Sequence, residues 1–166
     1  MIRDATSADI PALARLYVAT WKTTYGVRKG PTYELRERQW REAFSHIHGS
    51  WFCLVIERPN GELIGFAKGK RYASSDLPDF AGQLDKIYLL REYQRLGLGR
   101  RLVGHVARRF LGQGVGSMVL FGVASNPSCA CWEALGGERL YAPNGEFHGG
   151  YGWRNLQHLA STCPGE

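Results

Sequence analysis

The sequence predicts a mixed α/β domain in which helices flank a central, mostly antiparallel sheet with some parallel pairing. Three observations support this class: apolar runs alternate with helical repeats in the second half, two runs in the middle suit a hairpin, and the N-terminal part carries two amphipathic stretches. The chain has 166 residues, 44% hydrophobic and 22% charged, which suits a globular protein. We therefore expect a single domain spanning residues 1–166.

The first half of the chain predicts two helices and a hairpin. Ser7 or Asp9 can cap a helix, whose apolar residues recur at helical spacing at Ile10, Leu13, Tyr17 and Trp21. The charged stretch 33–44 carries apolar residues at 33, 40 and 44, which is typical of an amphipathic surface helix. Apolar runs on both sides of a Pro-Asn-Gly turn predict a hairpin over 51–72.

The second half predicts alternating strands and helices. A strand over 83–90 precedes a helix over about 98–111, and a strand over 118–121 precedes a shorter helix over 126–135. Two further strands are expected near 138–142 and 151–157.

The four cysteines predict neither disulfides nor a metal site. Cys53 lies in an apolar run, where a thiol acts as a small hydrophobe, and Cys129-Ala130-Cys131 has C-x-C spacing rather than C-x-x-C. We expect free, buried thiols, Cys131 among them. The N-terminus lacks the pattern of a signal peptide, and no apolar run approaches the roughly 18 residues of a membrane span. These features favour a cytoplasmic protein without a membrane partner.

The positive charge is concentrated in one segment. The chain carries a formal net charge of +6, and residues 91–109 contribute +5 of it through six arginines and the single acid Glu92. Gly97 and Gly99 lie between the strand and the helix, where a ligand can approach the backbone and the helix amides suit a phosphate. Leu102 replaces the third glycine of a dinucleotide fingerprint, and no P-loop Gly-Lys-Ser/Thr is present.

Two motifs resemble a known family. The segment Gln94-Arg95-Leu96-Gly97-Leu98-Gly99 is similar to the Q/R-x-x-G-x-G/A signature of the GNAT superfamily of acyl-CoA N-acyltransferases. The stretch 126–137 resembles a later motif of that family, in which an asparagine precedes a helix, and the order of elements fits over nearly the whole chain. The resemblance implies a GNAT-like domain that transfers an acetyl group from acetyl-CoA directly to a primary amine of a small molecule or peptide.

The resemblance also implies which residues bind the co-substrate. Backbone amides of the signature loop would hold the pyrophosphate of CoA, namely those of Arg95, Leu96, Gly97, Leu98, Gly99 and Arg100. The pantetheine arm would run beside Leu89 and Leu90, and Asn126 matches the family's asparagine near that arm. No metal is implied.

The chain departs from the family pattern at two catalytic positions. Gln83 stands where many members place a glutamate base, and glutamine can only position water. Asp85, two residues on and on the same strand face, is our candidate base, although an ordinary ion-paired acid is at least as good an interpretation. Trp132 stands where many relatives carry an acidic tyrosine, so the proton donor stays open among Tyr88, Tyr141 and water.

The acceptor side is less specific. Aromatic candidates for an amine pocket are Trp21, Tyr25, Tyr33, Trp40, Tyr141, Tyr151 and Trp153. The acids Glu34, Glu37 and Glu42 could attract a cationic acceptor or form a solvated helix face. Two alternative functions are a CoA-binding sensor without catalysis and a basic nucleic-acid-binding module. No nucleic-acid partner is expected, because binding of CoA explains the arginine cluster more specifically. The oligomeric state stays open, with a homodimer as one option.

Overall fold

The computed structural model describes residues 1–25, 32–46 and 50–163, with the side chains of residues 20–25 excepted. Within these ranges, seven strands form one sheet in the order β1-β2-β3-β4-β5-β7-β6, and five α-helices accompany them. β4 and β5 pair in parallel, whereas β1–β2, β5–β7 and β6–β7 pair antiparallel, which confirms the predicted fold class. The chain divides into two compact units, one of residues 1–68 and 86–102 and the other of residues 69–85 and 103–166.

The strands of the first unit begin with a pair that joins distant parts of the chain. β1 (Ile2–Asp4) pairs antiparallel with β2 (Trp51–Glu57), with Ile2 opposite Ile56. β3 (Leu63–Arg71) follows a tight turn in which the Arg58 amide donates to the Glu62 carbonyl at 2.9 Å. The hairpin is thus confirmed. β1 has only three residues and no apolar run, and its residues are half-buried or exposed, so the pattern of the sequence did not predict this strand.

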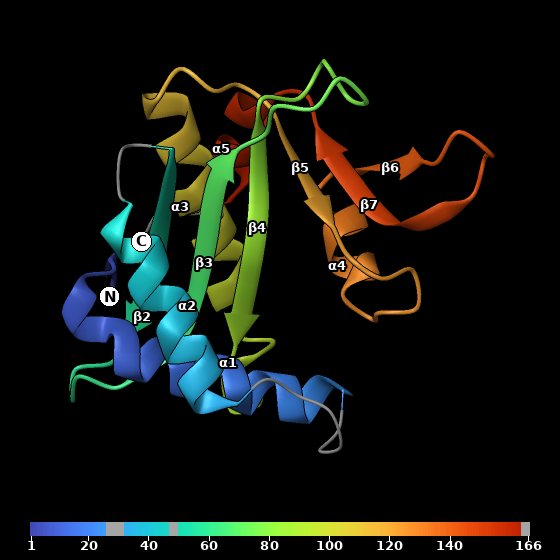
Figure 1. Cartoon of the computed structure of the whole chain (residues 1–166). Helices are drawn as coiled ribbons and strands as arrows, with labels where there is room; N and C mark the ends of the chain where they lie inside the picture. Colours follow the sequence, from blue (N-terminus) through green and yellow to red (C-terminus); the bar gives the residue numbers. More distant parts are fainter. Residues whose placement is uncertain (26–31, 47–49, 164–166) are drawn as a thin grey trace. The chain divides into compact units, whose positions relative to one another are not determined.

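Two helices cover one face of these strands (Figure 1). α1 (Ile10–Tyr25) follows a single 3-10 turn, and α2 (Tyr33–Ser45) begins behind Thr32, whose hydroxyl accepts the Leu35 amide at 3.2 Å. Both helices were predicted from their spacing. The start of α1 is fixed by Asp9, which accepts two hydrogen bonds from the Arg3 guanidinium at 2.8 and 2.9 Å.

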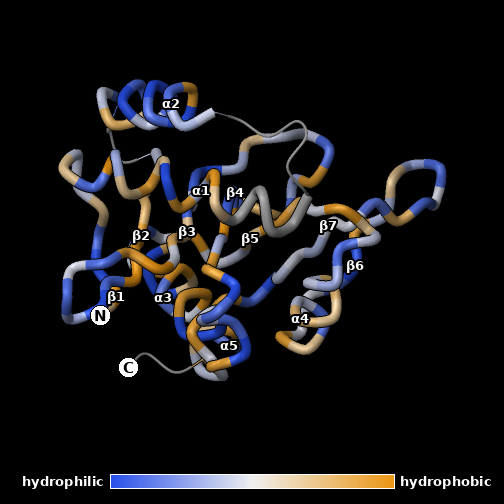
Figure 2. Tube along the Cα trace, turned by 90° about the horizontal axis from the view of Figure 1, so that it is seen from below, coloured by the Kyte–Doolittle hydropathy of each residue, from blue (hydrophilic) through white to orange (hydrophobic). Residues whose placement is uncertain are grey.

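Aromatic rings fill the space between these helices and the strands. Tyr17 of α1 lies 4.9 Å from Tyr88, Trp40 of α2 lies 5.5 Å from Phe66, and Phe66 lies 5.4 Å from Tyr88 between ring centroids. Figure 2 shows the same division along the chain, with α2 largely hydrophilic and β2 largely hydrophobic. Trp40 is the buried residue of α2, and the partly buried Tyr33 and Phe44 pack against the same core, so these three rings hold the helix on the strands.

The second unit contains the remaining strands and helices. Their bounds are β4 (Gly82–Leu89, which begins in this unit), α3 (Leu98–Gly112, which ends in it), β5 (Met118–Phe121), α4 (Cys129–Ala134), β6 (Glu138–Tyr141), β7 (Phe147–Trp153) and α5 (Leu156–Thr162). β7 pairs with β5 on one side and with β6 on the other, with Met118 opposite Trp153 and Glu138 opposite Gly152.

Two expectations for the C-terminal part were wrong. The last strand covers 147–153 rather than 151–157, and the helix α5 was not predicted. Asn155 explains the difference, because its side chain accepts the amides of Gln157 and His158 and starts a helix where the apolar pattern suggested more strand. Arg108 of α3 holds the other end of α5 by donating to the carbonyls of Ala160 and Cys163, both at 3.1 Å. One of the six clustered arginines therefore has a structural role.

The cysteines are free thiols, as predicted, but they are not all buried. Cys53 and Cys163 lie in the core, Cys129 is half-buried, and Cys131 is exposed. The expected core position of Cys131 was wrong because α4 spans only six residues and leaves this side chain facing solvent. In the described ranges, no three His, Cys, Asp or Glu side chains gather as they would around a metal ion. No described helix has both the length and the apolar character needed to cross a membrane.

Candidate functional site

The signature loop, residues 94–100, connects β4 to α3 in an unusual backbone conformation. A short 3-10 turn, Arg91–Tyr93, follows β4, and α3 begins at Leu98. Arg95 has φ 63° and Gly97 has φ 79°, so two left-handed residues flank Leu96. Alternation of left-handed and ordinary residues turns successive amides toward one concave side, which is a common anion-binding arrangement.

The loop leaves room for a ligand at its glycines. A Cβ added at Gly97 or Gly99 would meet no protein atom within 4 Å, and Leu96 is 66% exposed. Gly99 has no positive φ, so neither the backbone nor the protein's own packing requires a glycine there. The first turn of α3 closes when the Arg101 amide donates to the Gly97 carbonyl at 3.1 Å, and the amides that precede Arg101 in a helix start have no acceptor within the helix. The arrangement suits a phosphate group.

Hydrogen bonds from β4 hold the loop in place. The Gln94 side chain donates to the Leu89 carbonyl at 3.0 Å, and the Leu90 amide donates to the Ile64 carbonyl of β3 at 2.9 Å. Neighbouring residues of a strand direct their amides to opposite edges. The Leu90 amide is therefore bonded to β3. The Leu89 amide faces the opposite edge of β4, where it can donate a hydrogen bond to an extended ligand.

Asn126 has a clear local role in the second unit. Its side-chain oxygen accepts the Ser128 amide at 2.9 Å, and its carbonyl accepts the Cys129 amide at 3.1 Å. These bonds form the turn that starts α4. Asn126 is half-buried, and its side-chain amide nitrogen can still donate to a ligand.

The candidate catalytic residues lie near the start of β4. The parallel pairing with β5 joins Gly82 to Met118 and Gln83 to Val119. Leu84 is fully buried, whereas Gln83 and Asp85 are half-buried, as expected for two residues on one face of a strand. The Asp85 carboxylate lies 3.7 Å from the Lys70 ammonium. The ion pair expected for an ordinary acid is thus present, and Asp85 stays a prediction as the base.

The candidate proton donors differ in their surroundings. Trp132 packs edge-on against Trp153 with 6.3 Å between ring centroids, which fits a packing role. Tyr88 belongs to the aromatic core of the first unit, and Tyr141 is 60% exposed. Tyr151 is fully buried, and its burial raises the pKa of the phenol to about 12. A donor must release its proton in reach of the leaving group, so Tyr141 is the more accessible of the tyrosines.

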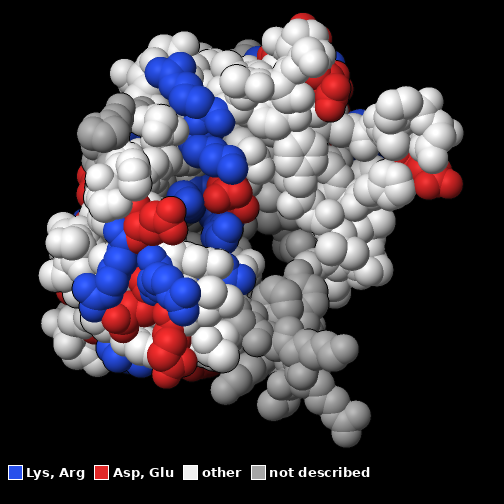
Figure 3. All heavy atoms as spheres, in the orientation of Figure 1, with Lys and Arg blue, Asp and Glu red and all other residues white. Residues whose placement is uncertain are grey.

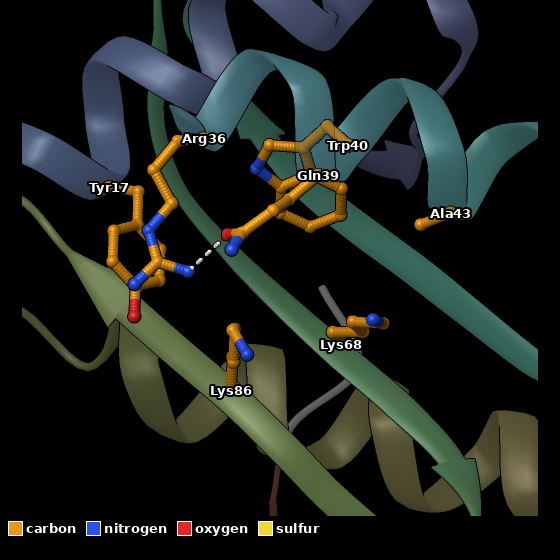
Figure 4. Close-up of a pocket in the computed structure, with 7 residues that line it drawn as sticks. All are labelled: Tyr17, Arg36, Gln39, Trp40, Ala43, Lys68 and Lys86. Atoms are coloured by element: carbon orange, nitrogen blue, oxygen red, sulfur yellow. Dashed lines mark hydrogen bonds between the residues drawn. The ribbon is translucent and has the colours of Figure 1, made fainter. Parts of the chain in front are cut away.

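The first unit also contains a pocket of about 260 Å³ that the sequence did not reveal. We call it the α2 pocket. Its lining residues come from α1, α2, β3 and β4 and are Tyr17, Arg36, Gln39, Trp40, Ala43, Lys68 and Lys86 (Figure 4). Its α2 members recur at positions 36, 39, 40 and 43, which is the spacing of one helix face. That spacing was the available signal for Arg36, whereas Lys68 and Lys86 had none.

The expected acceptor residues separate in the structure. Trp40 lines the α2 pocket, Tyr151 and Trp153 are buried in the second unit, and Tyr33 lies at the start of α2. The side chains of Trp21 and Tyr25 lie outside the described residues. None of the acids of α2 lines the α2 pocket, although Glu42 lines a shallower hollow beside it.

Comparisons with known proteins agree with this geometry. The sequence model of the Acetyltransferase (GNAT) family matches residues 12–136. The chain is 31% identical over 170 residues to the uncharacterized N-acetyltransferase YuaI of Bacillus subtilis, with 95% of each chain covered. It is 29% identical over 139 residues to a phosphinothricin N-acetyltransferase of Streptomyces viridochromogenes, with 81% of this chain and 72% of the relative covered.

Solved structures share the fold. The PaiA N-acetyltransferase of Thermoplasma acidophilum, crystallised in complex with coenzyme A, superposes with a TM-score of 0.70 at 19% identity. The match covers 92% of this chain and 96% of that protein.

Proposed function

This chain belongs to the acetyltransferase (GNAT) family and is an N-acetyltransferase, and from that premise we propose that it transfers an acetyl group from acetyl-CoA directly to a primary amine of a small molecule or peptide. The observation that best supports acetyl-CoA as the co-substrate is the open, two-glycine loop at the start of α3. A Cβ would fill the space that a pyrophosphate needs, and no packing within the protein explains the missing side chain at Gly99.

The chain's own groups divide the work of binding CoA. Amides of residues 95–100 hold the pyrophosphate, with the positive end of the α3 dipole behind them. The exposed arginines Arg95 and Arg100 add positive charge for the anionic co-substrate. The Leu89 amide donates to the pantetheine arm, the strand around Leu90 shapes its path, and Asn126 donates from the turn before α4.

The reaction needs little covalent help from the protein. Acetyl-CoA supplies a thioester carbonyl, to whose carbon the amine nitrogen forms a bond while the C–S bond breaks and the thiolate leaves with the electron pair. The ammonium form of the acceptor must first lose a proton. Asp85 accepts that proton, either directly or through a water that Gln83 orients, and its carboxylate lies 3.7 Å from the Lys70 ammonium.

The thiolate then requires a proton or a stabilising environment. Indole has no acidic proton near neutral pH, so Trp132 cannot supply it and serves instead to pack against Trp153. Tyr141 or water supplies the proton, and a thiolate can also depart unassisted into solvent.

A thiol-release assay tests the transfer. The protein is incubated with acetyl-CoA and amines ranging from polyamines to amino acids and N-terminal peptides, and free thiol and acetylated amine are measured together. We expect equal amounts of both products with at least one amine class. A protein whose melting temperature rises with CoA but which releases no thiol with any amine would be a CoA-binding sensor. Steeply salt-dependent RNA or DNA binding without any shift from acetyl-CoA would favour a nucleic-acid module.

A further inference from the structure

Two aromatic rings of the second unit meet over β4. Tyr72 follows β3, and its amide donates to the Ala81 carbonyl at 2.9 Å, directly before the start of β4. Phe121 ends β5, on the other side of β4 in the sheet. The two ring centroids lie 5.7 Å apart, whereas strands separated by one further strand lie about 10 Å apart. The rings therefore lean toward each other across β4.

The ring pair lies on the same face of the sheet as the candidate catalytic residues. Gln83 pairs with Val119 in the parallel ladder, and paired residues of neighbouring strands direct their side chains to one face. Phe121 is two residues further along β5, and Asp85 is two residues further along β4, so both return to that face at the same level of the sheet. The ring pair is thus beside the place where the acceptor amine must meet its proposed base.

Beyond Phe121, the row of side chains across the sheet has a gap. Phe121 pairs with Gly150 of β7, and Gly150 pairs with Leu140 of β6. A Cβ added at Gly150 would lie 3.5 Å from Phe121 and 3.6 Å from Leu140, at ordinary contact distances, and Gly150 has no positive φ. Neither the backbone nor crowding requires glycine here, and glycine within a strand often marks a place that a ligand approaches closely. We call the space above this residue, between Phe121 and Leu140, the Gly150 gap.

The surroundings of the Gly150 gap are apolar. Phe121 and Leu140 border it, and Tyr72 packs against Phe121. Phe121 is 48% exposed, and Figure 3 shows side chains other than Lys, Arg, Asp and Glu over β5 and β7. Large apolar side chains that are half in water gain free energy when an apolar group covers them. Two rings and one leucine suit a small group, since a stable protein interface needs a far larger area.

We propose that the Tyr72–Phe121 ring pair and the Gly150 gap bind an alkyl or aryl group of the acceptor, which makes the substrate a small primary monoamine with such a group close to its nitrogen. The rings hold that group by burial of apolar surface and by dispersion, and the missing side chain at Gly150 gives it room. The amine nitrogen then lies toward Asp85. This assignment rests on the proposed acetyl transfer.

The test compares amines that differ in one feature. Thiol release from acetyl-CoA is measured with propylamine, pentylamine and phenylethylamine. Pentylamine is matched by diaminopentane and aminopentanol, which carry a polar group at the far end of the same chain. We expect kcat/KM to rise about fourfold for each added methylene, and to fall at least about tenfold when a polar group is placed at the far end.

Variants locate the effect at the rings. Phe121→Ala and Tyr72→Ala each remove one ring, and each should reduce the preference for pentylamine over aminopentanol at least about fivefold by raising KM. Tyr72→Phe is the matched control, because it keeps the ring beside Phe121 and removes only the hydroxyl. It should keep the preference.

Gly150→Ala tests the gap itself. The added methyl group fits among its neighbours but occupies the gap, so kcat/KM for phenylethylamine should fall at least about tenfold, whereas that for propylamine should change less than about twofold. Gly116→Ala, shortly before β5, is the matched control. It adds the same group where no atom lies within 4 Å and φ is not positive, so both amines should react as with the wild type. Calorimetry should give each variant a dissociation constant for CoA within about twofold of the wild type.

The outcomes separate this assignment from the activity itself. Turnover of amino acids or polyamines but of no alkylamine would overturn the apolar acceptor while leaving acetyl transfer intact. A preference for pentylamine that both Phe121→Ala and Tyr72→Ala keep would overturn it too. A change of oligomeric state in Phe121→Ala, measured by light scattering, with the preference unchanged, would assign the rings to a contact between copies instead. CoA binding without thiol release from any amine would defeat the proposed acetyl transfer, and this assignment with it.

Discussion

The signature loop and the α2 pocket both offer space beside polar groups, but they are built from different parts of the chain. The loop uses backbone amides of residues that follow one another, and its shape depends on the left-handed φ values of Arg95 and Gly97. The pocket uses charged side chains brought from α2, β3 and β4. Binding to backbone amides requires small side chains nearby that leave room for the ligand. Binding to side chains requires each of the polar groups to be present.

The co-substrate that we propose is always the same molecule, so its pyrophosphate can be held by backbone groups that substitution does not alter. The charged residues of the α2 pocket lie on separate elements, where single substitutions leave the backbone intact. Asp85 is also a side chain, so we expect that its substitution changes turnover without changing the backbone groups that bind CoA.

The largest effect is expected at Asp85. Asp85→Asn removes the proposed proton acceptor, so kcat should fall by about a hundredfold and the pH–rate profile should move. The dissociation constant for CoA should stay within about twofold, because the loop that binds it uses backbone groups. Steady-state kinetics over a pH series and calorimetric titration with CoA measure the two quantities separately.

Lys70→Met is the matched control for Asp85. It removes the other half of the 3.7 Å ion pair but leaves the carboxylate. A base needs only the carboxylate, so kcat should change much less in this variant than in Asp85→Asn. If both variants keep full turnover, Asp85 is an ordinary ion-paired acid of β4 and the base lies elsewhere.

A smaller effect is expected at Gly99. Gly99→Val places a branched side chain into the space that protein atoms leave open, so the dissociation constant for CoA should rise by at least about tenfold, the loss of one charge-assisted hydrogen bond. Gly112→Val adds the same side chain at the other end of α3, also into open space, and should leave CoA binding unchanged. Calorimetry with CoA compares the two variants, and similar affinities would mean that the loop does not hold the pyrophosphate.

The same contrast explains what the sequence could predict about the site. Residues 94–99 are contiguous, so the glycines, the strand and the helix that form the loop could be recognised together. Arg36, Lys68 and Lys86 lie 50 positions apart at the extremes, and only the packing of α2 over β3 and β4 brings them together. The aromatic residues were expected as an amine site, but of those with described side chains Trp40 alone lines this pocket.

For the fold, too, features that are visible within one stretch of sequence were predicted, whereas features that depend on distant partners were not. Helices and strands with a clear period, such as α1, α2 and the β2–β3 hairpin, were predicted within a few residues. β1 and α5 were missed because their evidence is not periodic: β1 is a three-residue strand defined by its pairing with β2, and α5 depends on the cap at Asn155.

The most modest prediction concerns the start of α1, which supports the α2 pocket through Tyr17. Bonds from the Arg3 guanidinium are the main cause that lowers the pKa of Asp9, and the Thr6 amide adds a third at 2.8 Å. Because the folded pKa lies below the unfolded value of about 3.9, this contribution is fully present above that value and is lost as pH falls through the folded pKa. Asp9→Asn should therefore lower the free energy of unfolding by about 2 kcal/mol at pH 7 and by less at acidic pH.

Urea unfolding of the wild type and of Asp9→Asn at pH 7 and near pH 3 measures this difference. Glu62→Gln is the control, because its pair with Arg58 is exposed on both sides and should contribute less than about 0.5 kcal/mol at either pH. An equal loss for Asp9→Asn at both pH values would contradict an ionic contribution.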